Sequence, residues 1–419
     1  MDNPIVEKKY LIPFILVTSM FFLWGLANNM TDTLLAAFRR IMSMSDFQTS
    51  LIQVAFYGSY FCLALPAALF IRKFSYKSGL LLGLGFFITG ALLFYPASQT
   101  MVYGHFLAAL FILAGGLSVL ETTANPYILA MGNDKTSVQR LNLAQAFNPI
   151  GSISGVLLSQ FFILSHLNVA DATVRAGLSP AELRLIQEQE LNAVMGPYVG
   201  VALILAVVWI TIAVMKMPAA SSTNESINLK ATFQKLLGNS NYKWGVVAQF
   251  FYVGAQIGVW SYTIRYIMVE LDLNESGAAN YYLAALILFT IARFVFTGLL
   301  KKYRGSVLLI YSSFTAVLLL FFVIFAGGFI GAFALVGISG CMSLMFPTIF
   351  GLASEGLGKD RKVAGSGLIM AILGGAALTA IQGQVSDLTQ SIHLSFFVPM
   401  ACFLVVASYG YTNLKQNEQ

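Results

Sequence analysis

Long apolar runs, repeated from one end of the chain to the other, constrain its fold more than any other feature of the sequence. A run of about 20 apolar residues crosses a bilayer as an α-helix, because a helix satisfies its own backbone hydrogen bonds. Hydrophobic residues make up 58% of the chain and charged residues only 10%, whereas soluble domains carry about 25% charged residues. The short alternating segments of a membrane β-barrel are absent from the sequence. We therefore predict an all-α polytopic membrane protein with twelve transmembrane helices.

The predicted spans form two groups of six, separated by a polar stretch. The spans are 11–38, 49–71, 79–97, 101–131, 138–166, 195–216, 243–270, 277–300, 306–325, 329–354, 362–389 and 393–413. They give three predicted domains: an N-terminal six-helix bundle (1–217), a cytoplasmic linker (218–242) and a C-terminal six-helix bundle (243–419). The segment ANPYILAMG around Pro126 recurs as MFPTIFGLA around Pro347, in the fourth span of each group. Two related halves are typical of transporters that bind their substrate at the interface near the membrane midplane.

The distribution of basic residues predicts the orientation of the chain in the membrane. The predicted outer side holds Arg39, Arg40, Arg175, Arg184 and Arg265, Arg293 lies within a span, and the other Lys and Arg residues fall on the predicted inner side. This asymmetry predicts that both termini are cytoplasmic, in a multi-pass protein of the inner membrane. We attribute the net charge of +6 to the same bias rather than to nucleic-acid binding. The segment MDNPIVEKKY is interpreted as a cytoplasmic start to the first span, not as a cleaved signal peptide.

The sequence contains no motif of ordinary enzyme chemistry. It has no Walker A sequence, no HExxH and no dinucleotide-binding glycine pattern, and its three histidines have no partners at metal-ligand spacing. Cys62, Cys341 and Cys402 lie far apart in apolar runs and are interpreted as small core residues. We predict that the protein is not an enzyme and has no cofactor or metal, so that its energy comes from an ion or substrate gradient.

The strongest functional signal is a carboxylate within an apolar span. Glu121 lies in the fourth predicted span with Asn125 four residues later, and the fifth span carries Gln145 and Asn148 three residues apart, so each pair shares a helix face. An acid at membrane depth costs about 2.5–3.5 kcal/mol on insertion scales and is a functional hypothesis by default. Burial favours its neutral form, whereas water or polar neighbours restore the anion, so it can take up a proton on one side and release it on the other. The alternative is a structural carboxylate that is satisfied by amides.

The first and seventh spans carry further polar faces. Trp24, Asn28 and Asp32 are spaced by four, with Asn29 beside them. A capped or solvated residue near the outer helix end is the alternative for Asp32, although a cavity residue fits the inward continuation of this face better. Gln249, Tyr252, Gln256 and Trp260 share one face of the seventh span.

Amides both donate and accept hydrogen bonds, which suits uncharged ligands rich in hydroxyl groups. The residues Trp24, Tyr252, Trp260 and Phe346 could provide apolar platforms for the C–H face of a sugar ring, although lipid contact or core packing is the alternative for any single aromatic.

Three further features concern helix shape and the loops. Pro126, Pro149 and Pro347 interrupt helices at membrane depth and free backbone carbonyls. Arg293 has three open interpretations: a side chain that reaches the inner surface, a partner of an acid in an inner loop, or a residue that faces the cavity. The outer loop 167–194 contains a predicted short helix that begins with Ser179 as N-cap, and it is interpreted as a surface cover with gating as the alternative.

Four segments together resemble the fucose:proton symporter type of sugar porter in the major facilitator superfamily. They are FLWGLANNMTDTLL, ETTANPY, LNLAQAFNPIG and CMSLMFPTIFGLASEGLG, in the order and spacing of that family. The resemblance covers nearly the whole chain and implies the fold of two pseudo-symmetric six-helix halves. It also implies that Asp32 and Glu121 couple protons to sugar, that Trp24, Asn29, Gln145 and Asn148 line the cavity, and that Phe346 holds an aromatic position there. The loop RKFSYKSG lacks the aspartate of the usual superfamily motif, which argues against the usual charge-relay account of gating.

The sequence thus predicts a monomeric, proton-coupled symporter that imports a neutral monosaccharide by alternating access. L-Fucose is the first candidate, followed by glucose, galactose or an amino sugar. The alternatives are an exporter of drugs or metabolites from the same superfamily, and a membrane sensor that binds ligand without moving it. The predicted proton-coupling residues are Asp32 and Glu121. The predicted sugar-binding residues are Trp24, Asn28, Asn29, Glu121, Asn125, Gln145, Asn148, Tyr252, Gln256, Trp260 and Phe346.

Overall fold

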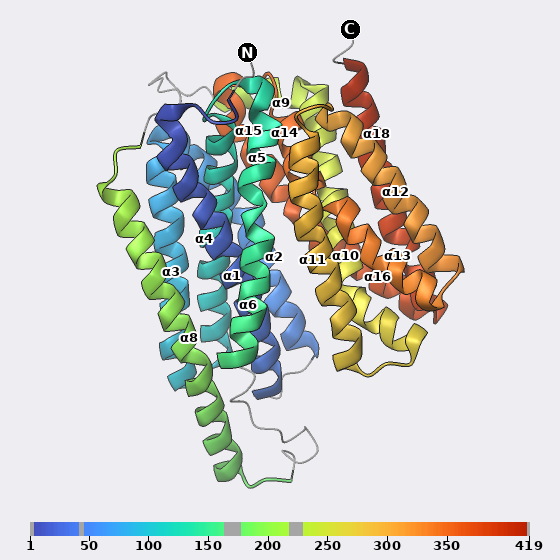
Figure 1. The fold of residues 1–419 in the computed structure, drawn as a ribbon. Coiled ribbons are helices and arrows are strands. Elements are labelled where there is room, and N and C mark those ends of the chain that lie inside the picture. Colours follow the sequence, from blue (N-terminus) through green and yellow to red (C-terminus); the bar gives the residue numbers. More distant parts are fainter. Residues whose placement is uncertain (1–3, 42–45, 163–176, 218–228, 417–419) are drawn as a thin grey trace.

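The computed structural model describes residues 4–41, 46–162, 177–217 and 229–416, and within these ranges it contains helices and no strands (Figure 1). The side chains of residues 31–41 and 46–50 and of a few other positions lie outside the described set. The helices of the first part are α1 (Leu11–Ile41), α2 (Asp46–Lys73), α3 (Tyr76–Thr100), α4 (Tyr103–Leu129), α5 (Ser137–Gln145), α6 (Phe147–Phe162) and α8 (Pro180–Val214).

The second part begins with a short helix, α9 (Leu229–Gly238), which lies within the predicted linker. The helices after it are α10 (Ser240–Leu271), α11 (Glu275–Leu299), α12 (Gly305–Phe325), α13 (Gly328–Met342), α14 (Met345–Ala353), α15 (Arg361–Met370), α16 (Gly374–Thr389), α17 (Ile392–Ser395) and α18 (Phe397–Gln416). Short 3₁₀ turns precede α1, α5 and α15, and another, η5 (Ala371–Leu373), joins α15 to α16.

Ten helical segments of the described chain are long and apolar enough to cross a membrane. The two other predicted spans are also helical. The fifth span is divided into α5 and α6 by a turn at Ala146, and its polar residues, among them Gln139, Arg140 and Asn142, lower its hydropathy. The seventh span is α10, whose Gln249 and Gln256 lower its hydropathy. With these two added, the structure has the twelve predicted transmembrane helices of a multi-pass membrane protein.

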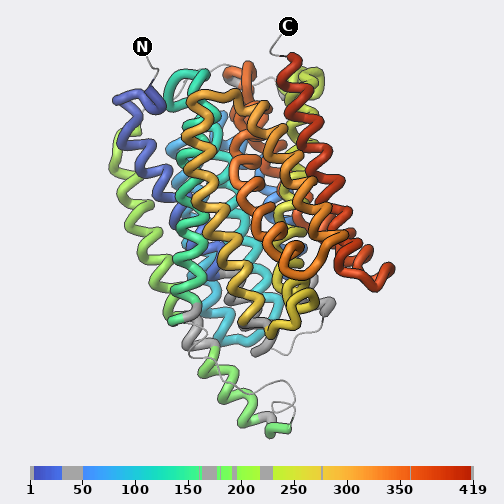
Figure 2. Tube along the Cα trace, turned by 45° about the vertical axis from the view of Figure 1, so that its right-hand side comes forward, coloured from blue at the N-terminus to red at the C-terminus, as the bar shows by residue number. Residues whose placement is uncertain are grey.

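The helices pack into two groups that lie side by side (Figures 1 and 2). In the first group α3 packs on α4, α2 on α4 and α1 on α6, and in the second group α12 packs on α18 and α10 on α16 and α18. Small residues allow these approaches: a Cβ atom added at Gly151 of α6 would lie 1.9 Å from the Phe22 carbonyl oxygen of α1. Glycine interfaces of this kind let helix backbones approach closely.

Contacts between the two groups concentrate near the end of the bundle where both chain termini lie, which we call the terminal end (Figure 1). There α15 packs on α2 and α4, and α14 packs on α5. The Gln139 amide donates to the Thr297 carbonyl (3.1 Å), and the Asn142 amide donates to the Thr348 hydroxyl (3.2 Å). The structure therefore has its two groups joined at the terminal end.

A charged cluster of four residues adds to this junction. Asp360, which precedes α15, lies 2.8 Å from the Lys235 ammonium of α9 and 3.7 Å from the Arg72 guanidinium of α2. The Thr232 hydroxyl of α9 accepts a hydrogen bond from Arg72 (2.9 Å) and donates one to Asp360 (3.2 Å). Helix α9 thus bridges the two groups.

One predicted element is wrong in its extent. The predicted start at Ser179 is confirmed, since its hydroxyl accepts from the Glu182 amide and the Glu182 carboxylate accepts in return from the Ser179 amide. The helix that begins there does not end in the outer loop, however. It continues without interruption to Val214 as α8, and it projects beyond the other helices at the end opposite the termini (Figure 1). Pro197, the proline within this stretch, is accommodated inside the helix and does not end it.

Candidate functional site

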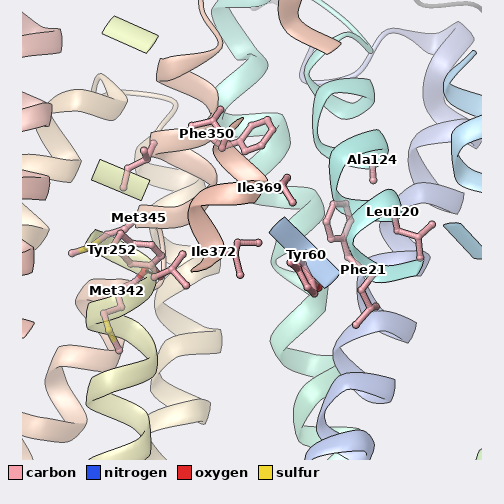
Figure 3. Close-up of a cluster of buried hydrophobic side chains, with 14 of the residues drawn as sticks. Phe21, Tyr60, Leu120, Ala124, Tyr252, Met342, Met345, Phe350, Ile369 and Ile372 are labelled. Atoms are coloured by element: carbon pink, nitrogen blue, oxygen red, sulfur yellow. Dashed lines mark hydrogen bonds between the residues drawn. The ribbon is translucent and has the colours of Figure 1, made fainter. Parts of the chain in front are cut away.

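A cavity of about 430 Å³ lies between the two groups of helices. Its volume is within the range of about 300–1,000 Å³ that is usual for small-molecule sites. Figure 3 shows a cluster of buried hydrophobic side chains from both groups, of which Phe21, Tyr60 and Ile372 also line the cavity. The polar and aromatic side chains that line it are Trp24, Asn28, Asn29, Gln53, Phe56, Tyr57, Tyr60, Glu121, Gln145, Asn148, Ser152, Gln256, Trp260, Ser261, Tyr282, Phe289, Arg293 and Phe346.

Most of the predicted site residues lie in this wall. They are Trp24, Asn28, Asn29, Glu121, Gln145, Asn148, Gln256, Trp260 and Phe346. Asn125 and Tyr252 are not part of the wall, and both are fully buried. The side chain of Asp32, on α1, lies outside the described residues. The structure therefore brings nine residues predicted from five separate spans around one cavity.

Glu121 lies on α4 with its side chain only 8% exposed. Its carboxylate accepts a hydrogen bond of 3.0 Å from the Tyr60 hydroxyl of α2. Among the described residues no Lys, Arg or His side chain forms an ion pair with it. A buried carboxyl group with a neutral partner can exist in either protonation state, because no fixed cation holds it as the anion. Glu121 thus has the environment of a group that gains and loses a proton.

The amides at the cavity are held in defined orientations by neighbours behind the wall. The Gln145 side chain donates to the Asn125 side-chain oxygen at 2.8 Å, and the Asn148 side chain donates to the Phe21 carbonyl at 3.2 Å. In both cases the amide nitrogen is engaged, which leaves the side-chain oxygen as an acceptor. Asn125 therefore acts behind the wall by orienting Gln145.

Aromatic side chains enter the cavity from both groups. The Trp24 ring stacks on Phe21 with a centroid distance of 5.5 Å, and the Trp260 ring lies edge-on to Phe289 at 5.1 Å. The Trp260 indole donates to the Ser339 hydroxyl at 3.2 Å, which fixes the direction of its ring. Tyr252 donates to the Met342 carbonyl (2.9 Å) and contacts Phe346, so it supports an aromatic residue of the wall from behind.

Arg293 of α11 faces the cavity, which was one of its three predicted positions. It is 4% exposed, and its guanidinium donates to the Ser343 carbonyl and, at 3.1 Å, to the Gln145 carbonyl. Each carbonyl lies four residues before a proline, Pro347 or Pro149, which has no N–H to bond it. The two prolines thus create the two acceptors that satisfy the buried cation. Because Gln145 belongs to the first group of helices, Arg293 also joins the two halves.

Sequence reasoning missed the contribution of α2. Gln53, Tyr57 and Tyr60 line the cavity from this helix and are spaced by four and three residues, so they share one face. That spacing was visible in the sequence. It was overlooked because two of the three are aromatic, and aromatic residues within an apolar span are usually packing residues. No group of three or more His, Cys, Asp or Glu side chains within the described ranges could hold a metal ion.

Comparisons with known proteins agree with this geometry. The family model of the Major Facilitator Superfamily matches residues 16–381. The chain is 39% identical over 423 residues to the L-fucose-proton symporter of Haemophilus influenzae, covering 98% of both proteins. It is also 32% identical to a glucose/galactose transporter of Brucella abortus, covering 98% of this chain and 96% of that protein.

Two solved transporter structures are similar to this chain in fold. A crystal structure of the Major Facilitator Superfamily transporter FucP in the outward conformation is 37% identical in sequence and has a TM-score of 0.91, with 97% of this chain and 99% of that chain covered. A structure of the proton:xylose symporter XylE, 12% identical with a TM-score of 0.71, shares the fold.

Proposed function

Because the chain belongs to the Major Facilitator Superfamily, we propose that it is a proton-coupled symporter that imports a neutral monosaccharide, with L-fucose as the first candidate. The observation that carries this proposal is Glu121, a buried carboxyl group in the wall of a cavity between two halves, with a tyrosine hydroxyl as its partner. Proton uptake at such a group changes the charge of the binding site. It can therefore couple the proton gradient to a change in conformation.

The proposed cycle begins with the structure as it stands, joined at the terminal end. Sugar enters the cavity, and the carboxylates of Glu121 and Asp32 each take up a proton and become neutral. Loss of charge removes the cost of enclosing carboxylates away from water, so the two halves can rock and open the terminal end. The contacts of Arg293 with Gln145 and of Asp360 with Arg72 separate in this step. Sugar and the protons then leave, and the empty protein returns.

Oriented amide oxygens support a sugar rather than an apolar drug as the substrate. Gln145 and Asn148 present acceptors to hydroxyl hydrogens, and Arg293 adds a donor for hydroxyl oxygens. Trp24 and Trp260 offer ring faces to the C–H groups of a pyranose. Ligand pockets are usually lined mainly by apolar side chains with a few placed polar groups, whereas this cavity has amides, hydroxyls and a guanidinium on several helices. An exporter of drugs or metabolites is accordingly the second candidate.

The distribution of basic residues supports the placement of the terminal end in the cytoplasm and of the protein in the inner membrane. We further propose a monomer with no cofactor, in which residues 1–217 and 243–419 are the two bundles and 218–242 the linker. Each bundle then moves as a unit about the cavity.

The test is uptake into proteoliposomes of a panel of radiolabelled monosaccharides, with an internal pH dye. The wild type should accumulate L-fucose and acidify the lumen. Glu121→Gln should retain exchange of labelled for unlabelled sugar and lose accumulation against a gradient, because exchange does not require release of the proton. Glu188→Gln, an exposed carboxylate on α8, is the matched control and should behave as the wild type.

The proposal is refuted if Glu121→Gln and Asp32→Asn both still concentrate sugar. Binding of sugar by the wild type without movement would favour the sensor, and efflux of apolar compounds without sugar uptake would favour the exporter.

A further inference from the structure

Tyr60 has features that its place in the core does not explain. It is 3% exposed, and its hydroxyl donates to a carboxylate that is itself buried, rather than to a backbone carbonyl as the hydroxyls of Tyr252 and Tyr266 do. A phenol of ordinary acidity is the donor in such a pair when the acid is ionised. Its proton therefore points at the one acid of the described cavity wall.

The backbone of Tyr60 is held beside Glu121. The Ser118 hydroxyl of α4 donates to the Tyr60 backbone carbonyl (3.0 Å), which holds α2 against α4 one turn before Glu121. The Tyr60 hydroxyl is thus kept within hydrogen-bond distance of the Glu121 carboxylate.

The other charged or titratable groups of the wall are few. Among the described residues they are Tyr57 on α2 and Tyr282 and Arg293 on α11. Helices α1, α5, α6 and α10 contribute amides, hydroxyls, indoles and apolar groups, and α3 packs Gly83 against Leu120 beside Glu121. Arg293 is engaged with two carbonyls. Tyr60 is the group in direct hydrogen-bond contact with the Glu121 carboxylate.

We propose that Tyr60 is a positioning residue for proton coupling: its hydroxyl, held beside the carboxylate by the packing of α2 on α4, stabilises the ionised form of Glu121 and so sets the pH at which this carboxyl releases its proton. A hydrogen bond from a neutral donor favours the charged form of an acid. When Glu121 takes up a proton, the bond from Tyr60 weakens, and the carboxyl becomes free to donate to a sugar hydroxyl. Tyr60 and Glu121 both line the cavity, so the hydrogen bond between them joins the sugar site proposed above to the group that holds the proton. This inference rests on the role proposed above for Glu121.

The test measures the protonation of Glu121 without sugar, so that its result does not depend on the identity of the substrate. Infrared difference spectra of the purified full-length protein in lipid are recorded from pH 4 to pH 10, in a background with Asp32→Asn. The band of the protonated carboxyl that disappears with Glu121→Gln is assigned to Glu121. Tyr60→Phe keeps the ring and removes the hydroxyl, and it should move the midpoint of this band to higher pH by about 1–2 units, the range expected for loss of a charge-assisted hydrogen bond.

Tyr95→Phe, which removes an exposed hydroxyl from α3, is the matched control and should leave the midpoint unchanged. A fluorinated tyrosine at position 60 donates more strongly and should move the midpoint to lower pH, a reversal of sign that a general loss of packing cannot produce. In uptake assays the pH dependence of L-fucose accumulation should move with the infrared midpoint. The inference is overturned if Tyr60→Phe leaves the midpoint where it is, whereas failure of the wild type to move any sugar counts against the proposed function alone.

Discussion

Asp360 offers a direct measure of what holds the terminal end closed. We consider the change Asp360→Asn, which keeps the size of the side chain and removes its charge. Asp360 is 9% exposed in its side chain, whereas the partner Lys235 is 59% and Arg72 17% exposed. The substitution leaves Thr232 with an amide to contact, so the loss is mainly that of two ion pairs. Because Asp360 is remote from the cavity wall, sugar contacts are unaffected.

The size of the effect follows from these exposures. The Lys235 ammonium is largely in water, and pairs of that kind contribute about 0.2–1 kcal/mol. The Arg72 pair is better buried, but its closest atoms are 3.7 Å apart, which is longer than a hydrogen bond. We expect the two ion pairs together to stabilise the closed terminal end by about 1–2 kcal/mol. Their loss corresponds to a change of about 5–30-fold in the equilibrium between the closed and the open terminal end.

Double electron–electron resonance measures this equilibrium directly. Spin labels at Phe74 and Lys302, both exposed in loops of different halves, report the separation of the halves at the terminal end in a background without the three native cysteines. Asp360→Asn should increase the long-distance population. Asp134→Asn is the matched control, since its pair with Arg361 has a carboxylate that is 79% exposed, and it should have a smaller effect. Equal distance distributions for the wild type and Asp360→Asn would refute the role assigned to the cluster.

Two further predictions concern stability. Burial raises the pKa of Glu355, in the loop after α14, from 4.5 to about 7, with Arg361 opposing this shift and Asp134 adding to it. The folded protein therefore binds this proton more tightly than the unfolded chain, and the associated stability is present below pH 4.5 and lost as the pH rises to about 7. At pH 8 in detergent, Glu355→Gln should increase the free energy of unfolding by at most about 3 kcal/mol and raise the melting temperature relative to wild type, whereas at pH 4 it should not. Gly151→Val would place side-chain atoms against the Phe22 carbonyl, so it should separate α1 from α6 and reduce the monodisperse peak in size-exclusion chromatography, whereas Gly200→Val on α8, where nothing lies within 4 Å of the added Cβ, should not.

The fold was predictable from the sequence because each span had to satisfy its own backbone within lipid, which left helices and their approximate lengths as the only solution. Polar spacing within one helix identified Glu121, Gln145 and Asn148, since polar side chains that share one face of an apolar span usually line a cavity or join helices. It did not separate residues that line the cavity from those one layer behind, because Asn125 and Gln145 have the same chemistry and differ only in which way the helix is turned. The partners of Tyr60 and Arg293 lie on helices far apart in the chain, and spacing along one helix does not encode such contacts.

The arrangement of Arg293 with Pro149 and Pro347 also limits how these positions can vary. An alanine at 149 would restore the amide that a regular helix needs, and the Gln145 carbonyl would then bond within its own helix. The guanidinium on the opposite half would then compete with that amide for the carbonyl. Each proline therefore leaves a carbonyl available to a cation on another helix, so the three positions are coupled through these two hydrogen bonds.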